Sequence, residues 1–79
     1  MYYVYILISE KNNKHYIGYS KNLDRRLKQH NLGVTRSTKA GKPWKIVYLE
    51  KFNTKQEAWN REHQIKSYKG GRAFRELLK

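Results

Sequence analysis

Residues 2–19, with the sequence YYVYILISEKNNKHYIGY, decide the architecture of this chain. Two runs, Tyr2 to Ile8 and His15 to Tyr19, are rich in the β-branched and aromatic residues that are typical of strands. The polar residues 10–14 between them are of the kinds that form turns. The sequence therefore predicts that the chain begins with an antiparallel β-hairpin.

The next segment predicts a helix, a loop and a third strand. Asn22 is a favourable N-cap and Asp24 suits the positive end of a helix dipole, so a helix should begin here. Asn31 and Gly33 supply its stop signal. Residues 34–43 contain Thr, Ser, Lys and Gly, which predicts a mobile basic loop, and residues 44–52 predict the third strand.

Two more helices complete the predicted order. Residues 54–57, TKQE, form a capping box that opens a helix running to about Ser67. Gly70 and Gly71 break the chain before a short last helix at residues 72–78. The order ββαβαα predicts a single α+β domain over residues 1–79, with a three-stranded, mainly antiparallel sheet flanked by helices.

The charge of the chain indicates a polyanionic partner. Eighteen Lys and Arg face six Asp and Glu among 79 residues, which gives a net charge of +12. Such a charge on a small body attracts nucleic acid. A ribosome-associated protein is an alternative, and an anionic membrane surface is a weaker one, since no helix pairs a basic face with large apolar residues. The absence of Cys and of any apolar run near about 20 residues fits a cytoplasmic protein.

Ionisable side chains lie on helix faces that should be apolar. At helical spacing, Arg26 and His30 share a row with Leu23 and Leu27, and Glu62 shares a row with Ala58 and Ile65. Charged groups are rarely buried unless they are paired or bound to a metal. These rows indicate a functional site. The structural alternatives are an Arg26–Glu62 salt bridge and a His30 that acts only as a cation near a helix C-terminus.

Tyrosines are concentrated in the hairpin, which holds five of the seven. Tyr5 and Tyr16 would share one face of the sheet if the register permits, although a strand tyrosine is more often part of the core. Gly18 is unusual because glycine weakens a strand and often marks a close approach of a backbone or ligand.

These residues together resemble the GIY-YIG nuclease superfamily, and its small single-domain bacterial members in particular. Tyr3-Val4-Tyr5 and Tyr16-Ile17-Gly18 match its paired triplets, with Tyr and Val replacing the Gly and Ile of the first. The similarity continues over essentially the whole chain, with Arg26, His30 and Glu62 at the corresponding positions. Repair-nuclease relatives carry Tyr where this chain has His30.

The resemblance implies a divalent-metal-dependent endonuclease that hydrolyses DNA. Glu62 would be the sole protein carboxylate on Mg²⁺ or Mn²⁺, and Arg26 would bind the scissile phosphate. Tyr5 or Tyr16 would be the general base, with its pKa lowered by Arg26 and the metal, and His30 would accept or relay the tyrosine proton. We expect all five side chains to converge around one solvent-reachable hollow.

The remaining expectations concern the partner. We expect a preference for DNA structure over sequence, with branched or nicked DNA of the repair or recombination type as substrate. No membrane and no small-molecule cofactor is expected, and the oligomeric state stays open. The alternatives are a non-catalytic nucleic-acid-binding protein on the same fold and a small RNA-associated factor. Exposed cations would contact the phosphate backbone: Lys21, Arg25, Lys28, Arg36, Lys39 and Lys42.

Overall fold

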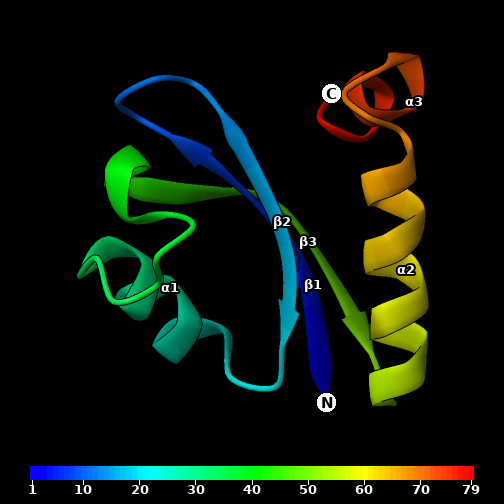
Figure 1. Ribbon diagram of the computed structural model, residues 1–79. Helices are drawn as coiled ribbons and strands as arrows, with labels where there is room; N and C mark the ends of the chain where they lie inside the picture. The colour runs from blue at the N-terminus through cyan, green and yellow to red at the C-terminus, as the bar shows by residue number, and fades with distance from the viewer.

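The computed structural model describes all residues 1–79 as a three-stranded sheet with helices on both faces (Figure 1). The elements are β1 (Tyr2–Ser9), β2 (His15–Ser20), α1 (Leu23–Asn31), the 3-10 turn η1 (Lys39–Gly41), β3 (Trp44–Phe52), α2 (Lys55–Ser67) and α3 (Arg72–Leu77). The strand order is β2-β1-β3 and both pairings are antiparallel. The predicted α+β class is confirmed.

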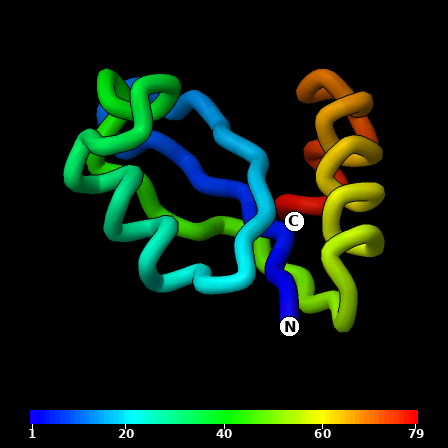
Figure 2. The backbone as a smooth tube through the Cα atoms, turned by 60° about the horizontal axis from the view of Figure 1, so that its bottom comes forward, coloured from blue at the N-terminus to red at the C-terminus, as the bar shows by residue number.

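The two long helices cover opposite faces of the sheet, as both ribbon views show (Figures 1 and 2). Side chains alternate along a strand, so the central strand β1 supplies both cores. Val4 and Ile6 pack with Ile65 of α2 on one face. Tyr5 packs with Leu27 of α1 on the other. The face on which each functional side chain lies follows from this alternation.

Local capping chemistry fixes the helix boundaries. The Asn22 side chain accepts a hydrogen bond from the Arg25 backbone N–H at 3.1 Å, as an N-cap should. Thr54 accepts from the Glu57 N–H at 3.2 Å, and the Glu57 carboxylate accepts from the Thr54 N–H, which completes the capping box. Gly33, at φ 77°, follows the end of α1. The predicted helix starts and the stop of α1 are thus confirmed.

The prediction of a mobile loop over residues 34–43 is wrong around η1. Thr38 and Gly41 are buried, and the Trp44 indole N–H donates to the Thr38 carbonyl at 2.8 Å. The Ser9 hydroxyl donates to the Gly41 carbonyl. A turn whose carbonyls are bonded to β1 and to the start of β3 is part of the packed structure. Periodicity could not show this, because each partner is distant in sequence.

Asn31 has a larger part than ending a helix. Its side-chain amide donates to the Trp44 carbonyl at 3.1 Å, and its side-chain oxygen accepts from the Trp44 N–H. One side chain therefore pairs with both backbone groups of the first residue of β3, in the manner of a neighbouring strand. This link fixes the C-terminal end of α1 against the sheet.

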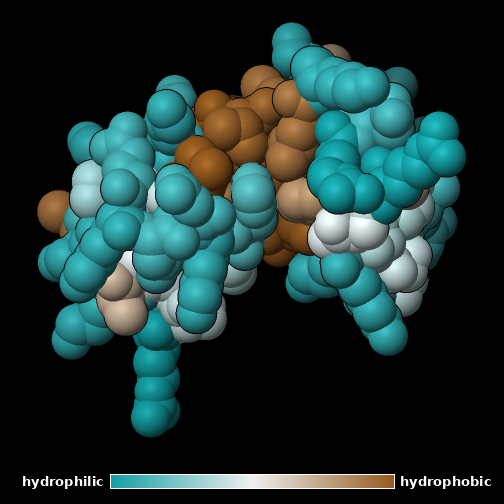
Figure 3. All heavy atoms as spheres, turned by 90° about the horizontal axis from the view of Figure 1, so that it is seen from above, coloured by the Kyte–Doolittle hydropathy of each residue, from teal (hydrophilic) through white to brown (hydrophobic).

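Seen from above, apolar atoms gather in the middle of the molecule between two hydrophilic flanks (Figure 3). The flanks are the sides on which α1 and α2 lie.

None of the helices combines the length and the apolar character that crossing a bilayer requires.

Candidate active site

The two tyrosines of the triplets lie on the same face of the sheet, as the sequence predicted. Tyr5 is opposite Gly18, and Tyr16 is opposite Leu7, so the two phenols are diagonal neighbours. A Cβ on Gly18 would lie 2.7 Å from the Tyr5 hydroxyl oxygen and 3.2 Å from Cε1 of Tyr16. Glycine is required here because the Tyr5 side chain lies across the position of its missing side chain. The predicted close approach at Gly18 is a contact within the protein.

His30 is the centre of this cluster. It is fully buried, with Nε2 3.2 Å from the Tyr5 hydroxyl and Nδ1 2.7 Å from Oγ1 of Thr38. Its ring centroid lies 4.9 Å from that of Tyr16. Burial, followed by the charge of Arg26, lowers the pKa of His30. The alternative of a cation that stabilises a helix end is therefore wrong, since the site favours the neutral imidazole.

Arg26 lies between this buried cluster and solvent. Its guanidinium donates to the Gln29 side chain at 3.1 Å and lies beside the Tyr5 hydroxyl, a contact that raises the pKa of Arg26. Next to it is an open hollow of about 540 Å³ with an entirely polar lining: Ser20, Lys21, Asn22, Arg25, Arg26 and Gln29. Three of these six residues are cationic, so the hollow suits an anion.

The electrostatics of Tyr5 differ from the expectation. Burial is the largest effect and raises the pKa of Tyr5, while Arg26 partly offsets it. Tyr16 and Glu62 add smaller effects that also raise this pKa. The expected lowering of a phenol pKa by Arg26 is thus outweighed at Tyr5, because this side chain is only 1% exposed. The raised pKa keeps Tyr5 protonated, whereas Tyr16 is partly exposed.

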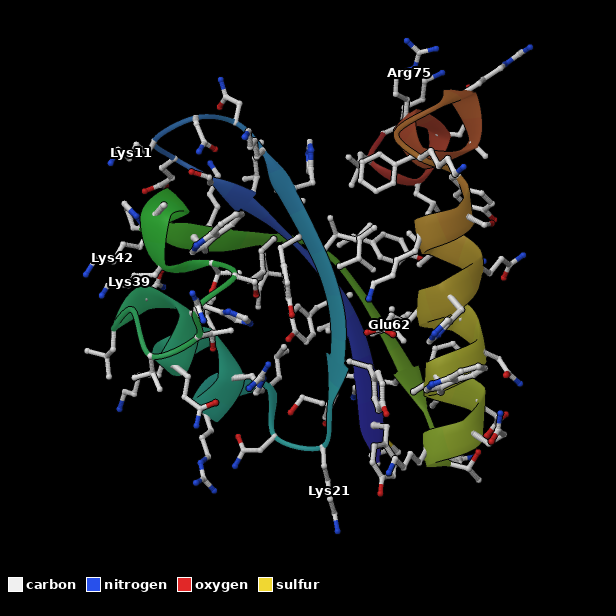
Figure 4. All side chains as sticks on the ribbon, viewed as in Figure 1. Lys11, Lys21, Lys39, Lys42, Glu62 and Arg75 are labelled. Atoms are coloured by element: carbon white, nitrogen blue, oxygen red, sulfur yellow. The ribbon has the colours of Figure 1, made fainter.

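Glu62 is carried by the helix on the other face of the sheet (Figure 1). It lies on α2 between Ala58 and Ile65, and this helix packs on the face of the sheet opposite to Tyr5. In Figure 4 its carboxylate points from α2 toward the strands. The basic groups near its carboxylate are Nζ of Lys66 at 3.6 Å and Nδ1 of His63 at 3.5 Å.

One structural alternative for Glu62 is corrected by this placement. No ion pair joins it to Arg26, so the structural alternative of a salt bridge between the two helices is wrong. The structure brings together Tyr5, Tyr16, Arg26 and His30, and Glu62 does not line the hollow beside Arg26. The charge of Glu62 is nevertheless among those that raise the pKa of Tyr5.

The six predicted phosphate contacts are all exposed: Lys21, Arg25, Lys28, Arg36, Lys39 and Lys42. Lys21 and Arg25 line the hollow beside Arg26. Lys39 and Lys42 project from the region of η1, away from Lys21 (Figure 4). The cations are therefore spread along the α1 side of the protein, and two of them adjoin the cluster.

Sequence reasoning missed two members of the site, Thr38 and Gln29. Thr38 is 1% exposed, and its hydroxyl is hydrogen-bonded to Nδ1 of His30. The side-chain oxygen of Gln29 accepts a hydrogen bond from Arg26. Gln29 could have been found from its i,i+3 spacing to Arg26 on one helix. Thr38 gave no signal, because a threonine in a segment of Thr, Ser and Lys has no pattern to distinguish it.

Comparison with known proteins finds a matching family model and similar proteins in other organisms. The family model of the GIY-YIG catalytic domain matches residues 1–72. A UPF0213 protein of Staphylococcus saprophyticus is 40% identical over 68 residues, which cover 85% of this chain and 82% of the relative. A UPF0213 protein of Clostridium perfringens is 45% identical over 67 residues, which cover 84% and 71%.

A solved structure shares the fold. The solution NMR structure of the UPF0213 protein BH0048 from Bacillus halodurans aligns with a TM-score of 0.55 and 35% identity, covering 99% of this chain and 82% of that one. The family match includes both triplets, Arg26, His30 and Glu62. The chain therefore belongs to the GIY-YIG catalytic domain family, whose members are nuclease-type hydrolases.

Proposed function

We propose that this protein is a divalent-metal-dependent endonuclease that hydrolyses phosphodiester bonds of DNA. The observation that carries the proposal is the cluster of Tyr5, His30 and Arg26 beside a hollow lined by three cations. Cleaving a phosphodiester requires binding of the phosphate, charge stabilisation and an activated water. This corner of the protein supplies groups for each.

The hollow would bind the DNA backbone. The planar guanidinium of Arg26 can donate two parallel hydrogen bonds to the oxygens of the scissile phosphate. Lys21 and Arg25 would contact flanking phosphates from the rim of the hollow. Because both side chains are exposed, binding a phosphate there removes little water from them. Because these contacts read the backbone, we expect a preference for DNA shape or structure over sequence.

Exposure separates the roles of the two phenols. Tyr16 is partly exposed and can reach an attacking water, so we assign it as the general base. Tyr5 is buried and keeps its proton, and its hydroxyl lies 3.2 Å from Nε2 of His30. His30 would then position Tyr5 instead of relaying a proton, since Nε2 is already engaged by that hydroxyl.

Glu62 fits the role of a metal ligand in its chemistry. It is 8% exposed, and no hydrogen bond engages its carboxylate, so its oxygens keep lone pairs for a cation. A bound Mg²⁺ or Mn²⁺ would lower the pKa of its water and neutralise charge on a phosphate. For Glu62 and Arg26 to serve one phosphodiester, the DNA must pass the edge of the sheet. β2 is an edge strand, and α2 packs against it.

The test is incubation of the purified protein with plasmid DNA and with a panel of flaps, forks, junctions, nicked and intact duplexes. Mg²⁺, Mn²⁺ and EDTA are compared. We expect metal-dependent cleavage that Glu62→Gln abolishes and Glu76→Gln leaves unchanged, since Glu76 is an exposed carboxylate on α3. Cleavage at one short sequence regardless of flanking structure would contradict the expected selectivity.

One observation favours a second candidate, a non-catalytic nucleic-acid-binding protein. Glu62 is carried by α2, which packs on the face of the sheet opposite to α1 and Arg26. Tight, salt-sensitive binding without cleavage of any substrate in the panel would support the binder.

A further inference from the structure

Thr38 is a buried residue whose polar contacts lead to the site. Its hydroxyl oxygen lies 2.7 Å from Nδ1 of His30 and 3.3 Å from the carbonyl oxygen of Thr35. We propose that Thr38 is a positioning residue that fixes the tautomer of His30 and thereby the direction of a hydrogen-bond chain that begins at the hydroxyl of Tyr5. This inference rests on the proposed function for its link to catalysis.

Counting protons at Thr38 gives the tautomer. A threonine hydroxyl has one proton, and a backbone carbonyl can only accept. Thr38 therefore donates to the Thr35 carbonyl and accepts from His30, which places the imidazole proton on Nδ1. A neutral imidazole protonated on Nδ1 has a free lone pair on Nε2.

The contact at Nε2 completes the chain. The Tyr5 hydroxyl lies 3.2 Å from Nε2 of His30 and can donate its proton to the lone pair there. The chain then runs in one direction: Tyr5 donates to His30, His30 to Thr38, and Thr38 to the backbone.

The position of Thr38 is fixed by its own backbone. Its N–H donates to the Thr35 carbonyl at 3.1 Å, and its carbonyl accepts from the N–H of Gly41 at 3.1 Å and from the indole of Trp44 at 2.8 Å. At 1% exposure it has almost no contact with water. A hydroxyl held this firmly can set the orientation of the imidazole.

The titratable groups that face His30 complete the argument. They are Tyr5 of β1, Tyr16 of β2 and Arg26 of its own helix, and no carboxylate contacts the ring. A neutral partner at Nδ1 and a nearby cation both favour the neutral form of His30 over the imidazolium. A neutral, correctly oriented imidazole keeps the Tyr5 oxygen available to Arg26.

The experiment measures the tautomer directly. Nitrogen-15 NMR of the His30 ring in the full-length protein at neutral pH should show Nδ1 protonated and Nε2 unprotonated. Thr38→Ser, which keeps the hydroxyl, should preserve this pattern. Thr38→Val, which keeps the shape, should lose it and reduce kcat for DNA cleavage by about a hundredfold, the cost of a misplaced reacting group. KM should change little, because Lys21 and Arg25 still bind the backbone.

A matched control is Thr35→Val, since Thr35 contributes a backbone carbonyl and no hydroxyl to the chain. An unprotonated Nδ1 in the unmodified protein, or a Thr38→Val protein with unchanged tautomer and kcat, would overturn the inference. If Thr38→Val does not fold, the spectrum of the unmodified protein and the Thr38→Ser comparison still decide. If no substrate is cleaved, the proposed function fails, while the ring spectrum separately tests the tautomer.

Discussion

Replacing Gly18 by Ala tests the packing of the site most directly. The added Cβ would lie 2.7 Å from the Tyr5 hydroxyl oxygen and 2.9 Å from Cζ, whereas ordinary contact begins at 3.4 Å. The phenol must therefore retreat by about 0.7 Å. Tyr5 is 1% exposed and its hydroxyl is already 3.2 Å from His30, so the ring has little space and the hydrogen bond cannot survive unchanged.

The expected cost follows from this overlap. Overpacking a core of this kind costs about 1–3 kcal/mol, which lowers Tm by about 5–20 °C in a domain of this size. Displacing Tyr5 also displaces its partner Arg26, and a misplacement near 1 Å can slow a reaction by about a hundredfold.

The assay combines thermal unfolding with single-turnover cleavage. Removing the hydroxyl in a Tyr5→Phe background should make Gly18→Ala less costly, because the two changes meet at one contact. Gly70→Ala is the control: it is strained by a φ of 73° but has no atom within 4 Å, so it should lower Tm without a specific effect on cleavage. A Gly18→Ala protein with unchanged Tm and cleavage rate would refute the reasoning.

Three further predictions concern the pH dependence of stability, the link between Asn31 and Trp44, and the salt dependence of DNA binding. Burial and the charge of Arg26 lower the pKa of His30, so this side chain binds a proton more weakly in the folded protein than in the unfolded chain. The free energy of unfolding should therefore fall as pH drops below about 6.5, and a His30→Gln variant should lose this dependence in urea titrations. Asn31→Ala leaves the backbone N–H and carbonyl of Trp44 unpaired and should lower the free energy of unfolding, measured by urea titration, by about 1–3 kcal/mol. A change smaller than the experimental error would show that these two hydrogen bonds contribute nothing to stability. Lys21→Gln should reduce the salt slope of DNA binding by about one unit, whereas an equal effect of Lys79→Gln would show that only net charge matters.

Most of the fold could be predicted from the sequence, because its signals are local. The strand residues, the Asn22 cap and the capping box act within a few positions of themselves, and the structure places the elements where these signals predicted. The charge of +12 and the paired triplets are likewise properties of the printed sequence. They indicated a nuclease-type family and a site of five residues: Tyr5, Tyr16, Arg26, His30 and Glu62.

Only the tertiary structure decided how these residues can act. A helical period shows which side of a helix is buried but not which face of the sheet it covers, so the position of Glu62 opposite to Arg26 could not be predicted. The raised pKa of Tyr5 and the role of Thr38 depend on burial and on hydrogen bonds between segments far apart in sequence. Sequence alone determined which chemical groups the protein has, and the packing of the sheet determined which of them meet, because burial and contact are properties of three-dimensional neighbours.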